Sequence, residues 1–346
     1  GYVGGRACGI TPGWHPDTQE PTCSEYMIIQ KTTLRALVAA VCLSAAAEAV
    51  PSAREVYEAT GIGGGVIVHV GAGTAEWTAT LRTSDAFMVH GLEQDAAKVD
   101  QARAMLRQKG LYGGVSIDRF DGTVLPYVEN FVNLLVSENL GDVSLAEVDR
   151  VLVPEGVAYV KIDGEWTRRV KPRPADIDEW THYFHSPSGN AVAQDDVVAP
   201  PRRLQWVGSP RWSRHHDRMA SMSALVTGGG RLFYIMDEGS RVSIQLPSHW
   251  RLIARDAFNG TVLWSREIPK WHSQLWPLKS GPTQLARRLV VADDRLYVTM
   301  SIDGPVECLD ARTGKTLHTC GGSVSYTHLT LPTINGECSS RWAPDH

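Results

Sequence analysis

The fold of this chain is decided by the stretch Val66-Ile67-Val68-His69-Val70-Gly71-Ala72-Gly73-Thr74-Ala75-Glu76. A continuous aliphatic run suits a strand that is buried on both faces of a parallel sheet. The two glycines that follow let the backbone turn sharply against a ligand before a helix begins. The stretch therefore predicts a strand, a glycine turn and a helix, an arrangement typical of a site for a nucleotide-type cofactor.

The residue type at position 76 limits which cofactor fits. A dinucleotide site of the form G-x-G-x-x-G needs a glycine where Glu76 stands. A carboxylate at that position would face the pyrophosphate at the helix N-terminus, so the sequence disfavours NAD. S-adenosylmethionine carries no phosphate, and a shorter G-x-G turn with an acid nearby is compatible with it.

A second strand and a carboxylate follow at a spacing that fits an adenosine ligand. Phe87-Met88-Val89-His90-Gly91-Leu92-Glu93 is predicted to be this strand. Glu93 at its end lies twenty residues beyond Gly73. This is the spacing of an acid that accepts hydrogen bonds from ribose hydroxyls.

The α/β alternation continues beyond this strand. A helical pattern runs from Ala96 to Gln108, and Gly110 ends it. The next strand, Val115-Ser116-Ile117, leads into a loop that contains Asp121. A carboxylate in this loop can accept a hydrogen bond from an adenine amino group.

From about Val66 to Val160 the chain resembles the class I SAM-dependent methyltransferases. The likeness rests on Val70-Gly71-Ala72-Gly73-Thr74, Gly91-Leu92-Glu93, Asp121-Gly122, Phe131-Val132-Asn133-Leu134-Leu135-Val136 and, most specifically, Glu147-Val148-Asp149-Arg150-Val151-Leu152-Val153-Pro154-Glu155-Gly156. It implies an α/β Rossmann-like domain with S-adenosylmethionine as cofactor. Gly71 and Gly73 would pass under the methionine moiety, Glu93 would hold the ribose hydroxyls, and Asp121 would hold the adenine. The likeness identifies no catalytic residue.

Three positions depart from the pattern of that family. The family usually has an acid where His69 stands, a third glycine where Ala75 stands, and Asp where Asn133 stands. Methyl transfer depends chiefly on placing the sulfonium methyl in line with a nucleophile. An altered site is therefore expected to lower turnover, and the domain is either a methyltransferase or a degenerate binding module.

Length and charge allow about two domains and give no sign of a nucleic-acid partner. The chain has 346 residues, a formal net charge of −4 and 43% hydrophobic residues. Arginines alternate with tryptophans between Pro201 and Arg218. In a chain of negative net charge this mixture favours a linker pinned to a neighbouring domain over a stacking platform for single strands.

The residues after Met27 have the pattern of a secretory signal peptide. Lys31 and Arg35 precede a small apolar core, and Ala47-Glu48-Ala49 offers a cleavage site. Residues 27–49 thus predict export to the periplasm or beyond, with no membrane span in the mature chain, since the segment is short for a span. Residues 1–26 are then upstream sequence without a function.

The last residues are also set apart from the fold. Val324-Ser325-Tyr326-Thr327-His328-Leu329-Thr330-Leu331-Pro332-Thr333 resembles the translation of a transposase-based sequencing adapter. Residues 324–346 are therefore excluded from fold reasoning. The chain is expected to be a fragment that is truncated at its C-terminal side.

A repeat occupies residues 202–323. Its Asp-Ala-x-x-Gly turn recurs after 54 residues, from Asp256 to Asp310 and from Gly260 to Gly314. Each copy is predicted to contain a strand, a loop, a second strand, a tight turn and a third strand, as in an antiparallel blade.

These copies resemble the quinoprotein-like (PQQ-repeat) β-propellers, in which Asp-Ala-x-x-Gly-x-x-x-Trp recurs. Trp264 fits this motif, whereas the second copy is predicted to end before its tryptophan position. The likeness implies an incomplete all-β propeller of about two blades, with tryptophan docking one blade on the next. Two blades cannot close a ring. The fragment offers no quinone-binding or metal-ligand set, so it does not support PQQ as a cofactor.

The predicted order is a methyltransferase-like domain at 50–164, a linker at 165–201 and the partial propeller. Asp178-Glu179-Trp180-Thr181-His182-Tyr183 is expected to anchor the linker through its aromatics. One function is SAM-dependent methyl transfer. The alternative is a non-catalytic binding or scaffold propeller, or a quinone-dependent dehydrogenase-like protein, whose partner is an unknown small molecule or protein. Export favours the alternative, because S-adenosylmethionine is made and kept in the cytoplasm.

Overall fold

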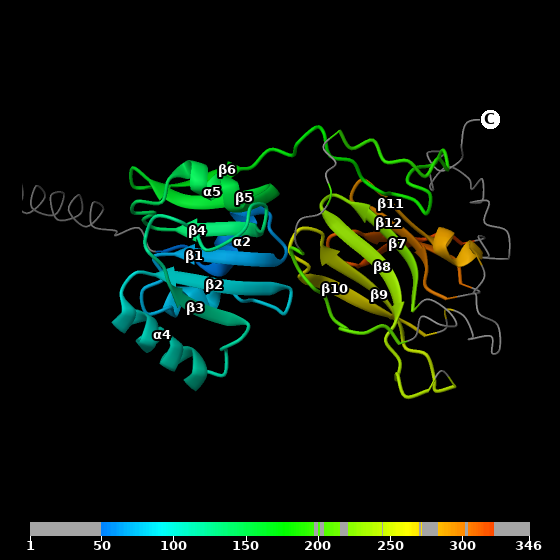
Figure 1. The fold of residues 1–346 in the computed structure, drawn as a ribbon, viewed down its shortest axis with the longest axis horizontal. Helices are drawn as coiled ribbons and strands as arrows, with labels where there is room; N and C mark the ends of the chain where they lie inside the picture. The colour runs from blue at the N-terminus through cyan, green and yellow to red at the C-terminus, as the bar shows by residue number, and fades with distance from the viewer. Residues whose placement is uncertain are drawn as a thin grey trace, which may run out of the picture. The chain divides into compact units, whose positions relative to one another are not determined.

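The computed structural model describes residues 50–196, 200, 204–214, 221–243, 245–269, 271, 283–301 and 304–321. The upstream stretch, the predicted signal peptide, the adapter-like tail and part of the arginine-tryptophan segment lie outside these residues. The described part contains one six-stranded α/β sheet and two four-stranded antiparallel sheets (Figure 1). None of the helices in this part has the length and apolar content needed to cross a membrane.

The α/β sheet has a Rossmann-like topology. Its strands are β1 (Gly65–Val70), β2 (Phe87–Glu93), β3 (Val115–Arg119), β4 (Val132–Ser137), β5 (Leu152–Ile162) and β6 (Glu165–Val170). They lie in the order β3-β2-β1-β4-β5-β6, and only β6 runs antiparallel to its neighbour. The strand order reverses between β1 and β4, the place at which open α/β sheets bind ligands beyond their carboxyl ends.

Helices and loops cover both faces of this sheet. The described helices are α2 (Ala53–Thr60), α3 (Glu76–Thr80), α4 (Ala96–Gln108) and α5 (Leu145–Val151). Residues of α2 and α4 share a core with Ile67 and Leu134, whereas those of α5 share the opposite core with Val68 and Leu135. All residues of β1 are buried, which confirms the prediction of a strand covered on both faces, and all residues of β4 are buried as well.

The sheet continues beyond position 164. Asp163 and Gly164 have φ angles of 52° and 90°, and two left-handed residues are typical of a tight hairpin. The hairpin pairs β6 with β5. The predicted linker therefore begins with a strand of the α/β sheet, a strand whose largely exposed residues give no hydrophobic pattern in the sequence.

The two antiparallel sheets pack around one common core. The first contains β7 (Met222–Gly228), β8 (Arg231–Asp237), β9 (Trp250–Asp256) and β10 (Val262–Ile268). The second contains β11 (Leu289–Ala292), β12 (Arg295–Thr299), β13 (Val306–Asp310) and β14 (Thr316–Thr319), preceded by the short helix η1 (Thr283–Arg288). Phe233 and Leu252 of the first sheet share this core with Leu296 and Leu309 of the second.

The two copies of the repeat have the same strand register. Trp264 pairs with Ala254 next to a register shift in the first sheet, and His318 pairs with Cys308 next to a register shift in the second. Each residue of the second pair lies 54 positions after its equivalent. The prediction that the second copy ends before its tryptophan position was therefore wrong, because β14 reaches that position and has histidine there.

A tryptophan packs on each repeat turn. The Trp264 indole donates to the Ala311 carbonyl at 3.1 Å, and a Cβ added at Gly314 would overlap its ring. Trp206 makes the same bond to the Ala257 carbonyl at 3.1 Å and lies over Gly260. Trp264 thus makes the docking contact expected from the motif, and Trp206 is a second such residue that the sequence analysis did not assign.

The linker segment around Trp180 lies against both antiparallel sheets. Its backbone exchanges hydrogen bonds with Thr227 of β7 at 2.8 and 2.7 Å, and the Thr181 carbonyl accepts from Val291 of β11 at 3.1 Å. The Trp180 ring packs edge-on against His185 within the linker itself. The segment is therefore anchored to the sheets through the backbone of Trp180 and Thr181, whereas anchoring through its aromatic rings was expected.

Candidate functional site

The glycine turn lies beyond the carboxyl end of β1 and is fastened to β2. Gly71 and Gly73 have φ angles of 78° and 54°, a region that glycine enters without steric cost. The amides of Gly71 and Ala72 both donate to the Leu92 carbonyl, at 2.9 and 3.0 Å. The turn is therefore held in one shape by the end of β2, the strand that ends at Glu93.

The Glu93 carboxylate is hydrogen-bonded to the glycine turn. One of its carboxylate oxygens accepts from the Gly73 amide at 2.8 Å, and the other accepts from the amides of Gln94 and Asp95 at 2.9 and 3.2 Å. The structure thus brings together two of the residues that the sequence analysis placed in one site. A carboxylate offers about four acceptor positions, so Glu93 retains capacity for a ligand hydroxyl.

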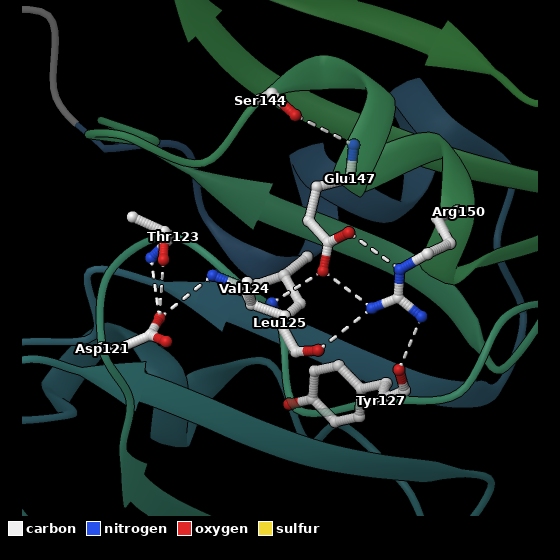
Figure 2. Close-up of polar contacts among 8 residues, drawn as sticks. All are labelled: Asp121, Thr123, Val124, Leu125, Tyr127, Ser144, Glu147 and Arg150. Carbon is white, nitrogen blue, oxygen red and sulfur yellow. Dashed lines mark hydrogen bonds and ion pairs between the residues drawn. The ribbon is translucent and has the colours of Figure 1, made fainter.

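Asp121 begins the next loop on the same edge of the sheet. The amide of Phe120, its neighbour, donates to the Glu93 carbonyl at 3.1 Å. One carboxylate oxygen of Asp121 accepts from the amides of Thr123 and Val124 at 2.8 and 3.0 Å (Figure 2). These backbone hydrogen bonds lower the pKa of the exposed Asp121 carboxyl, because they stabilise its ionised form.

A charged pair on α5 holds the far part of that loop. Glu147 accepts from the Leu125 amide at 2.8 Å, and Arg150 donates to the Tyr127 carbonyl at 2.8 Å (Figure 2). Ser144 caps α5 by accepting from the Glu147 amide at 3.2 Å. Glu147 and Arg150 belong to the most specific motif of the sequence, but their role could not be predicted from it, because their partners are backbone groups more than twenty residues away.

His69 is a neutral, buried group behind the glycine turn. Its Nδ1 lies 2.8 Å from the Thr78 hydroxyl on α3, and the Trp77 ring packs edge-on against it. Burial lowers the pKa of His69 to about 4, although Glu93 opposes this shift. At neutral pH the chain therefore has an uncharged imidazole where the resembled family usually has an acid.

Asn133 lies away from this site, at the amino end of β4. Its side-chain oxygen accepts from the Val66 amide at 2.8 Å and from Asn259 at 2.7 Å, and its side-chain nitrogen donates to Asp256 at 2.6 Å. Asp256 and Asn259 belong to the first repeat turn. The hydrogen bonds of the side chain at this position thus go to β1 and to the first repeat turn.

No family model and no curated protein sequence matches the chain. Several of the similar solved structures are named as methyltransferases, and another is named as a [4+2]-cyclase. They include a protein of Methanococcus maripaludis assigned as S-adenosyl-L-methionine-dependent (20% identity, 31% of this chain and 52% of that one, TM-score 0.29), geranyl diphosphate C-methyltransferase from Streptomyces coelicolor in complex with S-adenosyl-L-homocysteine (19%, 31% and 43%, 0.29) and a SAM-dependent methyltransferase from Aquifex aeolicus (18%, 31% and 62%, 0.29).

The chain covers between 43% and 62% of the length of these three structures. At such TM-scores the matches add no detail about the site. The assignment of a Rossmann-like sheet rests instead on the strand order and on the mostly parallel pairing of the chain itself.

Proposed function

We propose that the α/β sheet binds S-adenosylmethionine or its product S-adenosylhomocysteine in a methyltransferase-like site. The observation that carries this proposal is the Gly73–Glu93 hydrogen bond, 2.8 Å long, at the carboxyl ends of β1 and β2. Gly71 and Gly73 would lie under the methionine moiety. Glu93 would accept from the ribose hydroxyls, and Asp121 would accept from the adenine amino group.

The residues present fit an adenosine ligand better than they fit a sulfonium ion. When bound, S-adenosylmethionine supplies a methyl group on a positively charged sulfur. Glu93 and Asp121 offer acceptors for adenosine, whereas the neutral His69 removes a negative charge that the resembled family places near the cofactor. The proposed site therefore binds the cofactor weakly and discriminates little between its charged and uncharged forms.

Thermal unfolding of the whole chain with separate ligands tests this proposal. A ligand at ten times its Kd stabilises the folded state by about 1.4 kcal/mol. S-adenosylmethionine and S-adenosylhomocysteine, each at millimolar concentration, are expected to raise Tm, and NAD is expected to leave it unchanged. A rise with NAD alone would overturn the proposal, as would no response to either adenosyl ligand.

We further propose that the two antiparallel sheets are blades of an incomplete PQQ-like β-propeller that acts as a binding or scaffold module. The equal registers of the two copies and the tryptophan on each turn support this proposal. A quinone-dependent dehydrogenase remains the alternative. The sequence of the full-length gene distinguishes these two functions. Further Asp-Ala-x-x-Gly units with convergent polar residues at the ring axis would favour the dehydrogenase. Further units without such residues would favour the scaffold.

Export of the protein is part of this proposal, and it rests on the sequence of residues 27–49. Fusing these residues ahead of a mature alkaline phosphatase, which is active only outside the bacterial cytoplasm, tests it. Active phosphatase is expected, and a matched fusion with Leu37→Arg in the apolar core should be inactive. Inactive enzyme in both fusions would contradict export.

A further inference from the structure

We propose that Glu147 and Arg150 are positioning residues that hold the Asp121 loop, residues 121–127, in the shape that presents the Asp121 carboxylate to adenine. This inference rests on the proposed function, in which Asp121 accepts from the adenine amino group, and it adds the residues that position Asp121. It concerns residues that contact the loop and would not contact the ligand.

The two side chains act on the loop as one unit. Glu147 and Arg150 form a two-point ion pair with both N–O distances at 2.7 Å. The pair binds three backbone groups of the loop: the Leu125 amide at 2.8 Å, the Leu125 carbonyl at 3.1 Å and the Tyr127 carbonyl at 2.8 Å. Figure 2 shows both side chains pointing from α5 toward these groups.

The pair differs from an ordinary surface salt bridge, which contributes little to stability. Leu125 is buried in the core that α5 shares with Val68 and Leu135, so its partly buried amide and carbonyl need protein partners. Val124, one residue earlier, is 59% exposed. Glu147 and Arg150 thus hold the buried end of the loop, whereas Asp121 and Val124 are exposed.

A second contact ties the loop to the strand that carries Glu93. The Tyr127 hydroxyl lies 2.6 Å from Nδ1 of His90 on β2, and Nε2 of His90 lies 3.0 Å from Asp118 on β3. His90 precedes Glu93 by three residues on the same strand. The loop is therefore fixed at Tyr127 relative to the carboxylate proposed for the ribose, and this sets the separation between the ribose and adenine acceptors.

The first test is amide hydrogen exchange of the whole chain. Arg150→Lys keeps the charge and loses the planar fork, and Glu147→Gln loses the charge. Asp149→Asn is the matched control, because Asp149 lies on the same helix and pairs with Arg169 of β6 at 3.0 Å. The first two variants are expected to accelerate exchange in residues 121–127 at least tenfold with β1 and β4 still protected, and the control is not.

Wild-type exchange rates in residues 121–127 of both variants would overturn the proposal. An equal acceleration in the control variant, or in β1 and β4, would overturn it as well, because the pair would then contribute only general stability. This test needs no ligand, so its result is separate from the success or failure of the proposed cofactor binding.

The second test asks whether the loop recognises the adenine amino group of the ligand. Wild-type chain is titrated with S-adenosylhomocysteine and with S-inosylhomocysteine, which lacks that amino group. A preference of about tenfold for the adenosyl compound is expected, falling to about twofold in Arg150→Lys and persisting in Asp149→Asn. Binding without preference in the wild type, or an unchanged preference in Arg150→Lys, would overturn the role assigned to the pair. No binding of either compound would instead overturn the proposed function.

Discussion

His69 makes the stability of the folded chain depend on pH. Burial keeps the pKa of His69 at about 4 in the folded chain, whereas a free imidazole titrates near 6.5. Between these values the unfolded chain binds a proton that the folded chain does not. Acidification from pH 6.5 toward pH 4 therefore favours unfolding, and it does so by about 2–3 kcal/mol through this one residue.

Replacing the imidazole tests this linkage. Urea unfolding measures the free energy of unfolding at pH 7 and at pH 4.5. Between these pH values it is expected to fall by about 2–3 kcal/mol less in His69→Gln than in the wild type. The pKa of His182 is also lowered to about 4 by burial, and its contribution is present in both proteins. Identical pH profiles for the two proteins would contradict the burial of a neutral His69.

The resembled motif usually has a glycine where this chain has Ala75. The backbone of Ala75 is left-handed, a conformation that favours glycine. Ala75 is fully buried and has a φ angle of 65° at the start of α3. A left-handed conformation costs an L-residue roughly 1–2 kcal/mol. Ala75→Gly relieves this strain but removes a buried methyl group, so the stability is expected to stay within about 1 kcal/mol of the wild type.

A β-branched side chain at the same position gives the opposite expectation. Ala75→Val should lower the free energy of unfolding by at least about 2 kcal/mol, because branching at Cβ is poorly tolerated at positive φ. Chemical denaturation of both variants measures the difference. Equal stabilities for the glycine and valine variants would show that residue 75 is not left-handed.

Trp264 of the first antiparallel sheet packs on the repeat turn of the second sheet, and this contact helps to hold the two sheets together. Gly314 has a φ angle of 70°, and the ring of Trp264 fills the space that its Cβ would occupy. Gly314→Ala is expected to destabilise the chain by about 2–3 kcal/mol in thermal or urea unfolding. Gly321→Ala is the control, since a Cβ there meets nothing within 4 Å. Equal effects at the two glycines would contradict the packing.

Much of the secondary structure follows from the sequence because local signals agree with the fold. β2 at Phe87–Glu93 and α4 at Ala96–Gln108 have the predicted bounds. β6 could not be predicted in this way, since its residues are largely exposed and its place is set by pairing with β5. The pair Glu147 and Arg150 was visible as a motif, but its role depends on a loop that comes near only when the chain folds.

The contact of Asn133 with the first repeat turn joins the α/β sheet to the antiparallel sheet at a buried polar point. Asn133 donates to Asp256, and Asn259 donates to Asn133. Burial raises the pKa of the Asp256 carboxyl, although the Asn133 hydrogen bond opposes this shift. A second carboxylate at position 133 would face Asp256 without the donor that now lies between them.

An exchange of the two side chains tests this junction. Asn133→Asp alone is expected to destabilise the chain by about 3 kcal/mol at pH 7, because it places two carboxylates together in a buried site. Adding Asp256→Asn restores a donor opposite the new carboxylate and should recover at least half of the loss. Strictly additive losses in a double-mutant cycle of unfolding free energies would contradict the contact.

The sequence alone could place Gly71, Gly73, Glu93 and Asp121 on one edge of the sheet, because spacing and strand order determine where strands end. It could not predict the contacts of Asn133, whose partners Asp256 and Asn259 lie in the first repeat turn. Nor could it show that Glu93 already accepts the Gly73 amide at 2.8 Å. These contacts depend on tertiary packing, which leaves no local pattern.

Glu93 and the glycine turn are proposed to form a site for an adenosyl ligand. Calorimetric titration of the whole chain with S-adenosylhomocysteine, in the wild type and in Glu93→Ala, tests it most directly. Saturable binding of one ligand per chain is expected for the wild type, and an at least tenfold higher Kd, or no detectable heat, is expected for Glu93→Ala. No heat from the wild type at millimolar ligand, or equal affinity of the two proteins, would contradict it.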